Sequence, residues 1–543
     1  PYYGIYLDIT FTAPNGGLGT QTATISVSSN DPDINPFSLI VEAEMFNESI
    51  PGPGGITSNF KLWLKSTRGI VKSGSSLTDW LDLGTNGKDA TTVPGNEPTY
   101  LDTPADNINF NPVVKFENGA ATEQYMFNNN ATLSGFYNHD VFIVMVPDAT
   151  MTSASARNTI FAGVDSGSAG DITGIGFGDY SSEFTGEVLS YNQDVDAGGS
   201  YNGDAVTSGS YASPGIINIR NDAASSPNKQ DILYNSNVLT TTNVSDVTFT
   251  NIVGSEYWVG KNFDIAGSLN GRVAEIFTFA ERLSDADRQK VESYLAIKFG
   301  ITLGASTEAQ KDYINSFNTK VWDATVNAGY NYDVAGIGRD SISDLNQKQS
   351  KSINYTNSVT IGLGGVSATN SANPNEFVAD GDFLVWGNNN GAFTGTNTNT
   401  VTIALGVTTS LTRIDRKWKI VESNEDIDGD VESVYVSIPL AAFSGFTKTA
   451  TEEYVLIVAD NANFANGDII DVIPLRSDGG TNLETWYNFE GTNYFTFGVA
   501  PKLSENHSIS IASGDYLVGD NLLNLNVDKF SISAWIKVAA NTS

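Results

Sequence analysis

Short runs of β-branched and aromatic residues, separated by turn-forming residues, recur along the whole sequence. The runs 61–65, 141–146 and 454–459 are typical, because Gly, Asn, Asp or Pro follows each of them within a few residues. The 52 glycines of the chain fit a structure with many turns. Strands of this length, bounded in this way, are typical of proteins without a large helical content. The sequence therefore predicts an all-β fold.

The length of 543 residues exceeds what a single hydrophobic core supports and predicts about three or four domains. The segment 51–55, Pro-Gly-Pro-Gly-Gly, marks a boundary, because Pro cannot donate to a strand ladder and Gly does not hold one. We divide the chain into the end of an immunoglobulin-like sandwich (1–49), a Pro/Gly linker (50–56), a large sandwich ending in a helix (57–303), a second β-sandwich module (304–501) and the truncated start of a further domain (502–543). A weak helical pattern at 307–317 opens the module 304–501.

One amphipathic helix is predicted over 284–299. Ser284 is placed as its N-cap, with Asp287 three residues later in the manner of a capping box. Apolar residues recur at helical spacing from Val291 onward, and Gly300 suits the left-handed residue that ends a helix. We expect this helix to pack on the large sandwich.

Charge and residue counts exclude several classes of function. Lys+Arg 29 against Asp+Glu 62 leaves a net charge of −33, which repels nucleic acid and attracts divalent cations. Cysteine is absent, and the two histidines, His139 and His507, are too few for a multi-histidine zinc site. No apolar stretch is long enough for membrane insertion, and any export signal is expected outside this segment. We expect a protein that is not an enzyme.

Two segments carry resemblances to modules of bacterial surface proteins. Residues 22–37 resemble the closing half of a choice-of-anchor, immunoglobulin-like module. The segments 62–65 and 114–119, with Trp80 and the segment 274–277 that precedes the helix, resemble a concanavalin A-like, laminin-G-type lectin domain. The resemblance implies a jelly roll with one packed helix, within a multi-domain array of β-sandwiches.

The C-terminal half carries further resemblances. Residues 333–340, 384–389 and 416–418 resemble the β module that follows such a lectin domain in giant proteins exported by the type IX route. Residues 530–537 resemble the start of another laminin-G-type domain. Together these resemblances imply a long array on the surface of gliding-type bacteria, similar to gliding-motility adhesins.

The function expected from this reading is binding and spacing at the cell surface. The laminin-G-like module is expected to bind an extracellular polysaccharide or a surface protein, and further modules of the same long chain are its covalent neighbours. One alternative is a carbohydrate-binding segment of a secreted polysaccharide hydrolase. Another is a purely structural stalk without a ligand. The identity of the ligand stays open.

Acidic loops are the candidate calcium sites, since Ca²⁺ takes six to eight oxygen ligands. Asp426, Asp428 and Asp430 occupy alternate positions in the loop 424–432, which lacks the frame of an EF-hand. A second candidate set lies in Gly/Ser-rich loops of the lectin-like module and consists of Asp165, Asp171 and Asp179. The alternative for both sets is solvated, turn-forming carboxylates.

Ligand contacts are predicted in the same loops. Tyr180 and Tyr191 are candidates for stacking on sugar rings, as are Tyr201 and Tyr211, and Asp194 is a candidate for binding sugar hydroxyls. The alternative is that these tyrosines are packing residues at strand ends.

Overall fold

The computed structural model divides the chain into two compact units, Pro1–Pro51 and Gly52–Ser543. The structure describes residues 19–27, 37–45, 51–84, 87–119, 122–129, 139–148, 158–165, 168–177, 189–194, 201–206, 211–222, 229–243, 255–261, 269–304, 310–355, 357–395, 397–403, 407–424 and 430–502. The predicted module at 502–543 therefore lies outside the described residues apart from Lys502.

The N-terminal unit contains an antiparallel pair of strands. β1 (Gly19–Val27) pairs with β2 (Phe37–Met45) in a register that joins Val27 to Phe37 and Gly19 to Met45. The alternating sequence on either side of residues 30–33 predicts this pair. The assignment of the unit to an immunoglobulin-like sandwich stays a prediction.

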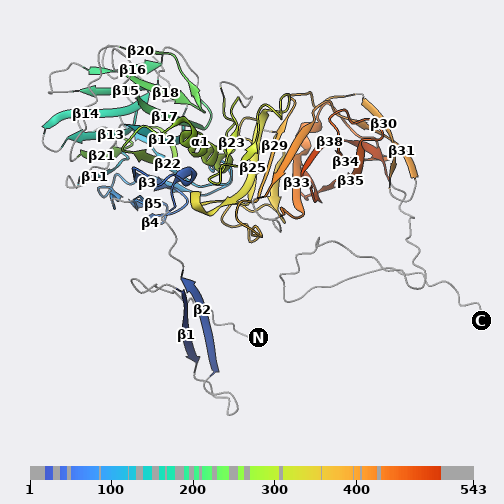
Figure 1. The fold of residues 1–543 in the computed structure, drawn as a ribbon, viewed down its shortest axis with the longest axis horizontal. Helices are drawn as coiled ribbons and strands as arrows, with labels where there is room; N and C mark the ends of the chain where they lie inside the picture. The colour runs from blue at the N-terminus through green and yellow to red at the C-terminus, as the bar shows by residue number, and fades with distance from the viewer. Residues whose placement is uncertain are drawn as a thin grey trace, which may run out of the picture. The chain divides into compact units, whose positions relative to one another are not determined.

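The first sandwich, as we call strands β3–β22 of the C-terminal unit, is built from antiparallel strands that form a continuous network of pairings (Figure 1). Its paired strands are β3 (Phe60–Lys65), β4 (Ile70–Ser73), β5 (Ser76–Trp80), β6 (Ala90–Thr91), β7 (Thr99–Leu101), β8 (Val113–Phe116), β11 (Met126–Asn128), β12 (Asp140–Pro147), β13 (Asn158–Asp165), β14 (Ser168–Phe177), β15 (Leu189–Asp194), β16 (Tyr201–Val206), β17 (Gly215–Asp222), β18 (Lys229–Tyr234), β19 (Asn237–Val238), β20 (Thr241–Asn243), β21 (Ser255–Val259) and β22 (Gly271–Phe279), with β9 (Asn118–Gly119) and β10 (Thr122–Glu123) as a separate small pair.

Strand β12 shows how this sheet buries both of its faces. Val141 and Ile143 belong to the cluster between the layers of the first sandwich, while Phe142 and Val144 belong to a cluster on the opposite face. Successive side chains of a strand point to opposite faces, so a continuous apolar run such as 141–146 requires a cover on both sides. The helix and the following module cover the face that carries Phe142 and Val144.

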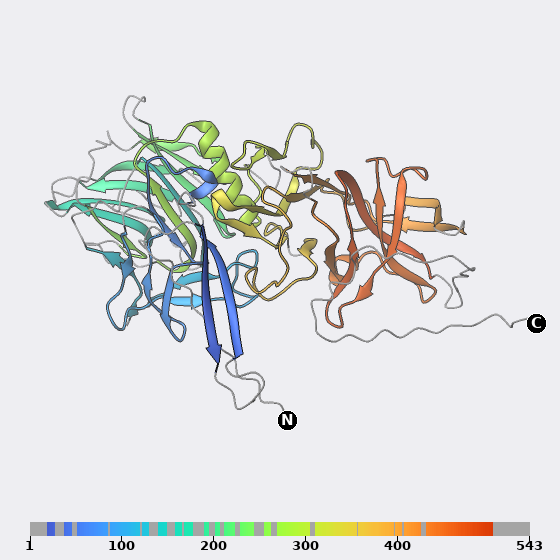
Figure 2. The ribbon, with the colours of Figure 1, turned by 60° about the horizontal axis from the view of Figure 1, so that its bottom comes forward.

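The helix α1 (Asp285–Phe299) confirms the prediction from the sequence. Ser284 is its N-cap, with its side chain accepting a hydrogen bond from the backbone N–H of Asp287, and Gly300 ends it at φ 64°. Its buried face includes Val291 and Leu295, which join the outer cluster of the first sandwich. Figures 1 and 2 show α1 between the first sandwich and the strands that follow it in the chain.

The helical pattern at 307–317 is wrong for the described part of that segment, 310–317. β23 (Tyr313–Ile314) pairs there with β24 (Lys320–Trp322) through a turn in which Asn318 has φ 71°. Tyr313 is buried, and its hydroxyl donates to the carbonyl of Ile301 and accepts from the N–H of Leu303. Long-range packing of this tyrosine thus overrides a weak local preference.

The second sandwich, as we call the strands from β25 to β38, has two antiparallel sheets in the described part of the chain. The larger sheet contains β25 (Tyr332–Asp340), β26 (Leu345–Gln347), β29 (Phe383–Asn388), β30 (Asn397–Ile403), β31 (Val407–Arg413), β32 (Trp418–Ser423), β34 (Glu452–Ala459), β35 (Ile469–Pro474) and β38 (Thr492–Pro501), and the smaller contains β27 (Gln349–Lys351), β28 (Thr360–Leu363), β33 (Val434–Pro439), β36 (Arg476–Ser477) and β37 (Asn482–Tyr487). Short 3-10 helices lie at Pro53–Gly55, Ser341–Ser343 and Leu440–Phe443.

The core of the second sandwich lies between its two sheets. Leu384 and Ile420 of the larger sheet meet Ile361 and Val436 of the smaller one in a single apolar cluster. The described part of the chain is therefore all-β with one packed α-helix, as the sequence predicts. Trp63, Trp80, Trp386 and Trp418 are buried in these cores, and Trp258 is half-buried.

The two sandwiches share apolar packing and polar contacts. The cluster on the outer face of the first sandwich continues into Trp322, Leu345 and Phe383 of the following module. Asn109 donates to the hydroxyl of Ser350 at 2.9 Å and accepts from the backbone N–H of Lys351 at 2.8 Å. Because apolar surface of each sandwich is buried on the other, they form one packed body. The domain boundaries given above remain predictions.

Candidate functional site

Three of the acidic residues that are predicted to bind Ca²⁺ or a ligand lie near one end of neighbouring strands. Asp165 is the last residue of β13, Asp171 precedes Ile172 in β14, and Asp194 is the last residue of β15. Ile172 is paired with Asp194 on one side and with Val164 on the other. Asp165 is paired with Ser168, because the register between β13 and β14 shifts after Val164.

Tyr201 extends this row by one strand. It opens β16 and is the register partner of Asp194. We call the four residues Asp165, Asp171, Asp194 and Tyr201 the strand-end row. Residues at the ends of sandwich strands adjoin the connecting loops, where β-sandwiches carry their binding residues. The register thus pairs Asp194 with Tyr201, whereas Asp165 and Asp171 lie where the pairing of β13 with β14 shifts.

The prediction that Tyr191 stacks on a ligand is wrong. Its ring is fully buried and belongs to the core of the first sandwich together with Ile175 and Leu189. Tyr211 is also buried and contacts Phe177, with the ring centroids 5.2 Å apart. Both tyrosines are packing residues in the core of the first sandwich. Asp179 and Tyr180 lie outside the described residues.

In the predicted acidic loop, Asp430 is described, whereas Asp426 and Asp428 lie outside the described residues. Asp430 lies beside Glu422, the carboxylate of which accepts backbone N–H groups from Val431 at 2.8 Å and from Gly491 at 2.9 Å. Burial and the neighbouring Asp430 raise the pKa of Glu422 to about 7. The sequence prediction missed Glu422, because it lies in β32 and not in the loop.

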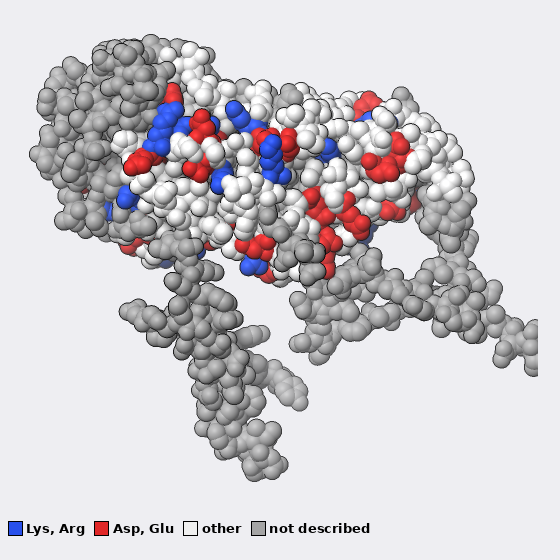
Figure 3. All heavy atoms as spheres, in the orientation of Figure 1, with Lys and Arg blue, Asp and Glu red and all other residues white. Residues whose placement is uncertain are grey.

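Charge is distributed unevenly over one face of the molecule. In Figure 3 the charged side chains over the second sandwich are mostly Asp and Glu, whereas both signs of charge are mixed nearer to α1. A negative surface of this kind raises the local concentration of cations. Within the residues that the structure describes, no group of three or more His, Asp or Glu side chains is arranged to hold a metal ion.

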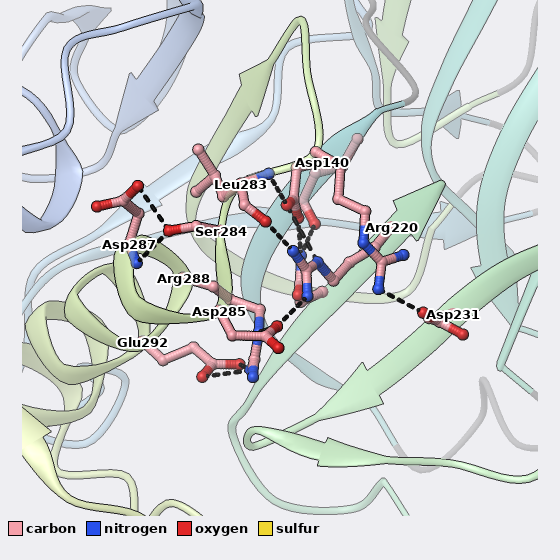
Figure 4. A network of polar contacts seen from close by, with 12 residues as sticks. Asp140, Arg220, Asp231, Leu283, Ser284, Asp285, Asp287, Arg288 and Glu292 are labelled. Carbon is pink, nitrogen blue, oxygen red and sulfur yellow. Dashed lines mark hydrogen bonds and ion pairs between the residues drawn. The ribbon is translucent and has the colours of Figure 1, made fainter. Parts of the chain in front are cut away.

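Charged side chains beside α1, buried apart from the exposed Asp285, form a separate network that holds the helix (Figure 4). Asp140 accepts from Arg220 Nε at 3.1 Å and from the N–H of Leu283 at 3.0 Å, and Arg220 Nη1 reaches Asp285 at 3.0 Å. Arg288 pairs with Glu292 at 2.6 Å. Burial raises the pKa of Asp140, and the Arg220 charge opposes that shift. The contacts of Asp140 and Arg220 with Leu283 and Asp285 join α1 to β12 and β17.

A second buried network centres on Glu275 of β22. Its carboxylate accepts from Trp63 Nε1 at 2.6 Å, from the hydroxyl of Tyr294 at 2.9 Å and from Lys298 Nζ at 2.7 Å. Burial lowers the pKa of Lys298 to about 7, and the Glu275 charge opposes that shift. A strand and a helix meet here through buried charges.

Comparison with known proteins yields one family and distant structural likenesses. A family described as a domain of unknown function (DUF8202) matches residues 287–492, from within α1 to the start of β38. No curated protein matches the chain. In the described part of the chain, no helix combines the length and the apolar character that crossing a membrane requires.

Several solved structures align with the chain at low similarity. The binding domain of botulinum neurotoxin serotype D/C VPI 5993 aligns over 82% of this chain and 94% of its own, with 13% identity and a TM-score of 0.30. The CBM40 of the Ruminococcus gnavus IT-sialidase, bound to α2,3 sialyllactose, aligns over 28% of this chain and 79% of its own, with 11% identity and a TM-score of 0.22. A heptameric SAP-like pentraxin from Limulus polyphemus aligns over 28% of this chain and 67% of its own, with 13% identity and a TM-score of 0.20. No function is transferred at this level of similarity.

Proposed function

We propose that this chain is a binding and spacing segment of a bacterial cell-surface adhesin, exported by the type IX route, and that it is not an enzyme. The observation that carries the binding role is the strand-end row, in which the register of β15 and β16 pairs Asp194 with Tyr201, next to the strands β13 and β14 that carry Asp165 and Asp171. Carboxylates accept hydrogen bonds from sugar hydroxyls, and a polysaccharide is the ligand class that suits them best.

The spacer role is supported by the packing between the two sandwiches. The apolar cluster that includes Phe142 of the first sandwich and Phe383 of the following module is continuous. A junction buried in this way resists bending, whereas a flexible linker would leave neighbouring modules free to rotate. A stiff pair of sandwiches holds a binding surface at a set distance from the cell.

We also propose that Ca²⁺ binds the acidic loop 424–432. Asp430 and Glu422 supply two neighbouring carboxylates, and Asp426 and Asp428 supply further oxygens from the same loop. Calcium would relieve the repulsion between the two carboxylates and would favour their ionised forms. The carboxylates of the strand-end row are a second candidate site for Ca²⁺.

The binding proposal is tested with the full 543-residue chain on a glycan array, in Ca²⁺ and then in EGTA. We expect a polysaccharide ligand, and we expect the paired variant Asp171→Asn/Asp194→Asn to lose most of the binding. Asp102→Asn is the matched control, because Asp102 is an exposed acid in another loop of the same sandwich. Binding that survives in the paired variant would place the ligand elsewhere, and no binding at all would leave a structural stalk.

The calcium proposal has its own measurement, the melting temperature in Ca²⁺ and in EGTA. At a free Ca²⁺ concentration of 100 times the Kd, binding to the folded state alone adds about 2.7 kcal/mol to stability. We expect Asp430→Asn to reduce this gain and Asp102→Asn to retain it. An equal melting temperature with and without Ca²⁺ in the parent chain would contradict the proposal.

A further inference from the structure

Three basic side chains gather on one face of the larger sheet of the second sandwich. Arg413 ends β31, Lys417 precedes β32, and Lys419 lies within β32. They contact the rings of Phe464 and Tyr494, which belong to the apolar cluster on the face turned away from the core between the two sheets. β31 and β38, which carries Tyr494, are neighbouring strands (Figure 1). We call Arg413, Lys417 and Lys419 the basic patch.

Aromatic rings hold the cations of the basic patch in place. The guanidinium carbon of Arg413 lies 5.2 Å from the ring centroid of Phe464, and Nζ of Lys417 lies 5.4 Å from the same centroid. Nζ of Lys419 lies 5.7 Å from the ring centroid of Tyr494. The quadrupole of an aromatic ring attracts a cation but does not neutralise it. The basic patch therefore keeps its positive charge.

Acidic side chains do not pair with the basic patch. Each of its residues donates to an uncharged oxygen, which is Asn399 Oδ1 for Arg413 at 3.2 Å, the carbonyl of Ala462 for Lys417 at 2.9 Å and the carbonyl of Val326 for Lys419 at 3.3 Å. Among the described residues, no Asp or Glu forms an ion pair with any of the three, although the chain has 62 acids against 29 Lys and Arg. Arg416, by contrast, pairs with Asp333 at 3.5 Å.

Burial makes these charges costly. Arg413 is 7% exposed, Lys419 is 6% exposed, and Lys417 is half-buried. Burial lowers the pKa of all three groups, and the charge of Arg413 lowers the pKa of Lys417 further. Asp415 lies between Arg413 and Lys417 in sequence, but it is exposed and its carboxylate accepts from Asn397. Buried charges are ordinarily paired with opposite ones, so the basic patch lacks a negative partner that a ligand can supply.

Two half-buried tyrosines adjoin the basic patch. The rings of Tyr330 and Tyr494 have their centroids 5.4 Å apart, with the planes inclined by 63°. Burial raises the pKa of Tyr330 to about 12, and the nearby charge of Arg413 opposes that shift. Tyr330 thus connects Arg413 to Tyr494 and to Lys419 beside it. A tyrosine offers an apolar ring and a hydroxyl, which are the groups that contact a sugar.

We propose that the basic patch binds the anionic groups of an acidic polysaccharide, either the carboxylate of a uronic acid or a sulfate ester. Guanidinium and ammonium groups form charge-assisted hydrogen bonds with such oxyanions. The net charge of −33 repels a polyanion at long range, but salt screens that field beyond about 8 Å at physiological ionic strength. Contacts within the basic patch therefore decide the binding.

This proposal goes beyond the role of the strand-end row, because the basic patch lies on the other sandwich and takes ligands of the opposite charge preference. The two sites are tested separately. The variant Asp171→Asn/Asp194→Asn is expected to bind a polyanion as the parent chain does, and its loss of polyanion binding would place that ligand on the first sandwich and overturn the proposal.

The experiment measures the Kd of the full chain for dextran sulfate, polygalacturonate and uncharged dextran by biolayer interferometry at about 150 mM NaCl. We expect a polyanion to bind and uncharged dextran not to bind. Binding of dextran sulfate alone would identify a sulfate ester, and binding of polygalacturonate alone would identify a carboxylate. Lys417→Gln is expected to raise the Kd about tenfold through loss of a charge-assisted hydrogen bond. Lys417→Arg keeps the charge and is expected to retain binding.

Lys448→Gln is the matched control, because Lys448 is an exposed lysine of the same sandwich whose Nζ lies 6.0 Å from the ring centroid of Tyr454. It removes the same charge and is expected to leave the Kd unchanged. The melting temperature of each variant shows whether it is folded. The proposal is overturned if neither polyanion binds more tightly than dextran. It is also overturned if folded Lys417→Gln and Lys448→Gln bind the polyanion equally well.

Discussion

Glu275 is the buried carboxylate on which β22, β3 and α1 converge. Removing its charge leaves the ammonium of Lys298 without its carboxylate partner at a site where that lysine is 5% exposed. We expect Glu275→Gln to lower the free energy of unfolding by about 3–5 kcal/mol, because breaking a buried pair leaves an uncompensated charge. Chemical denaturation followed by tryptophan fluorescence measures this loss.

The double variant Glu275→Gln/Lys298→Met provides the internal control for that prediction. It removes both charges and keeps an amide oxygen for the N–H of Trp63 and the hydroxyl of Tyr294. Replacing both members of a buried pair by uncharged side chains is often close to neutral. We therefore expect the double variant to recover most of the stability, and a double variant as unstable as Glu275→Gln would show that packing dominates.

The raised pKa of Glu422 predicts that the stability of the folded chain depends on pH. Its pKa rises from an ordinary value of 4.5 to about 7 in the folded chain, because of burial and the neighbouring Asp430. The folded state therefore holds this proton more tightly than the unfolded state. The stability contribution is fully present below pH 4.5 and is lost as the pH rises through about 7.

In the measurement, melting temperatures between pH 4.5 and pH 7.5 are compared for the parent chain and Glu422→Gln without Ca²⁺. The difference between the two curves isolates the titration of this residue, and we expect the variant to lack the loss seen in the parent. Glu281→Gln, an exposed acid just before α1, is the control. Parallel curves for Glu422→Gln and the parent would rule out the raised pKa.

The contact between the two sandwiches depends on the helix α1. Substitutions at its two ends are expected to lower stability by different amounts. Ser284→Ala removes a side-chain cap and is expected to cost about 1 kcal/mol. Gly300→Ala is expected to cost about 2–3 kcal/mol, because φ is 64° and an added Cβ would meet the carbonyl oxygen of Lys351. Thermal and chemical unfolding measure both changes.

Lys290→Ala is the control for the two helix ends, since Lys290 is half-buried in the middle of α1 and Ala is a good helix former. We expect it to change stability by less than about 0.5 kcal/mol. If Gly300→Ala lowered stability no more than Ser284→Ala, this result would show that a small backbone shift relieves the close approach of the Lys351 carbonyl to the helix end.

At the scale of the whole molecule, the shared cluster predicts that the two sandwiches unfold together. Separating the chain between residues 303 and 304 would expose Leu303 and Phe299 on one side and Trp322 and Phe383 on the other. We expect residues 52–502 to unfold in one transition, and each separated half to melt at a lower temperature and bind a hydrophobic dye. Two halves that retain the melting temperature of the joined chain would show independent domains.

Local signals account for the parts of this structure that the sequence predicts well. The all-β class follows from short apolar runs and turn residues, and α1 follows from Ser284, the apolar spacing and Gly300, because all of these act within a few residues of chain. The weak pattern at 307–317 carries no such cap, and the packing of Tyr313 outweighs it.

The candidate sites depend on contacts between distant residues, which local signals do not specify. Tyr191 resembles a loop aromatic in sequence, yet the facing layer buries it. Asp194 lies at the strand-end row because the register pairs it with Ile172, and two cations of the basic patch lie beside one ring because Phe464 packs against both. Turn and strand propensities act along the chain, whereas register and burial arise from the packing of whole sheets, and so the folded structure alone brings these residues together.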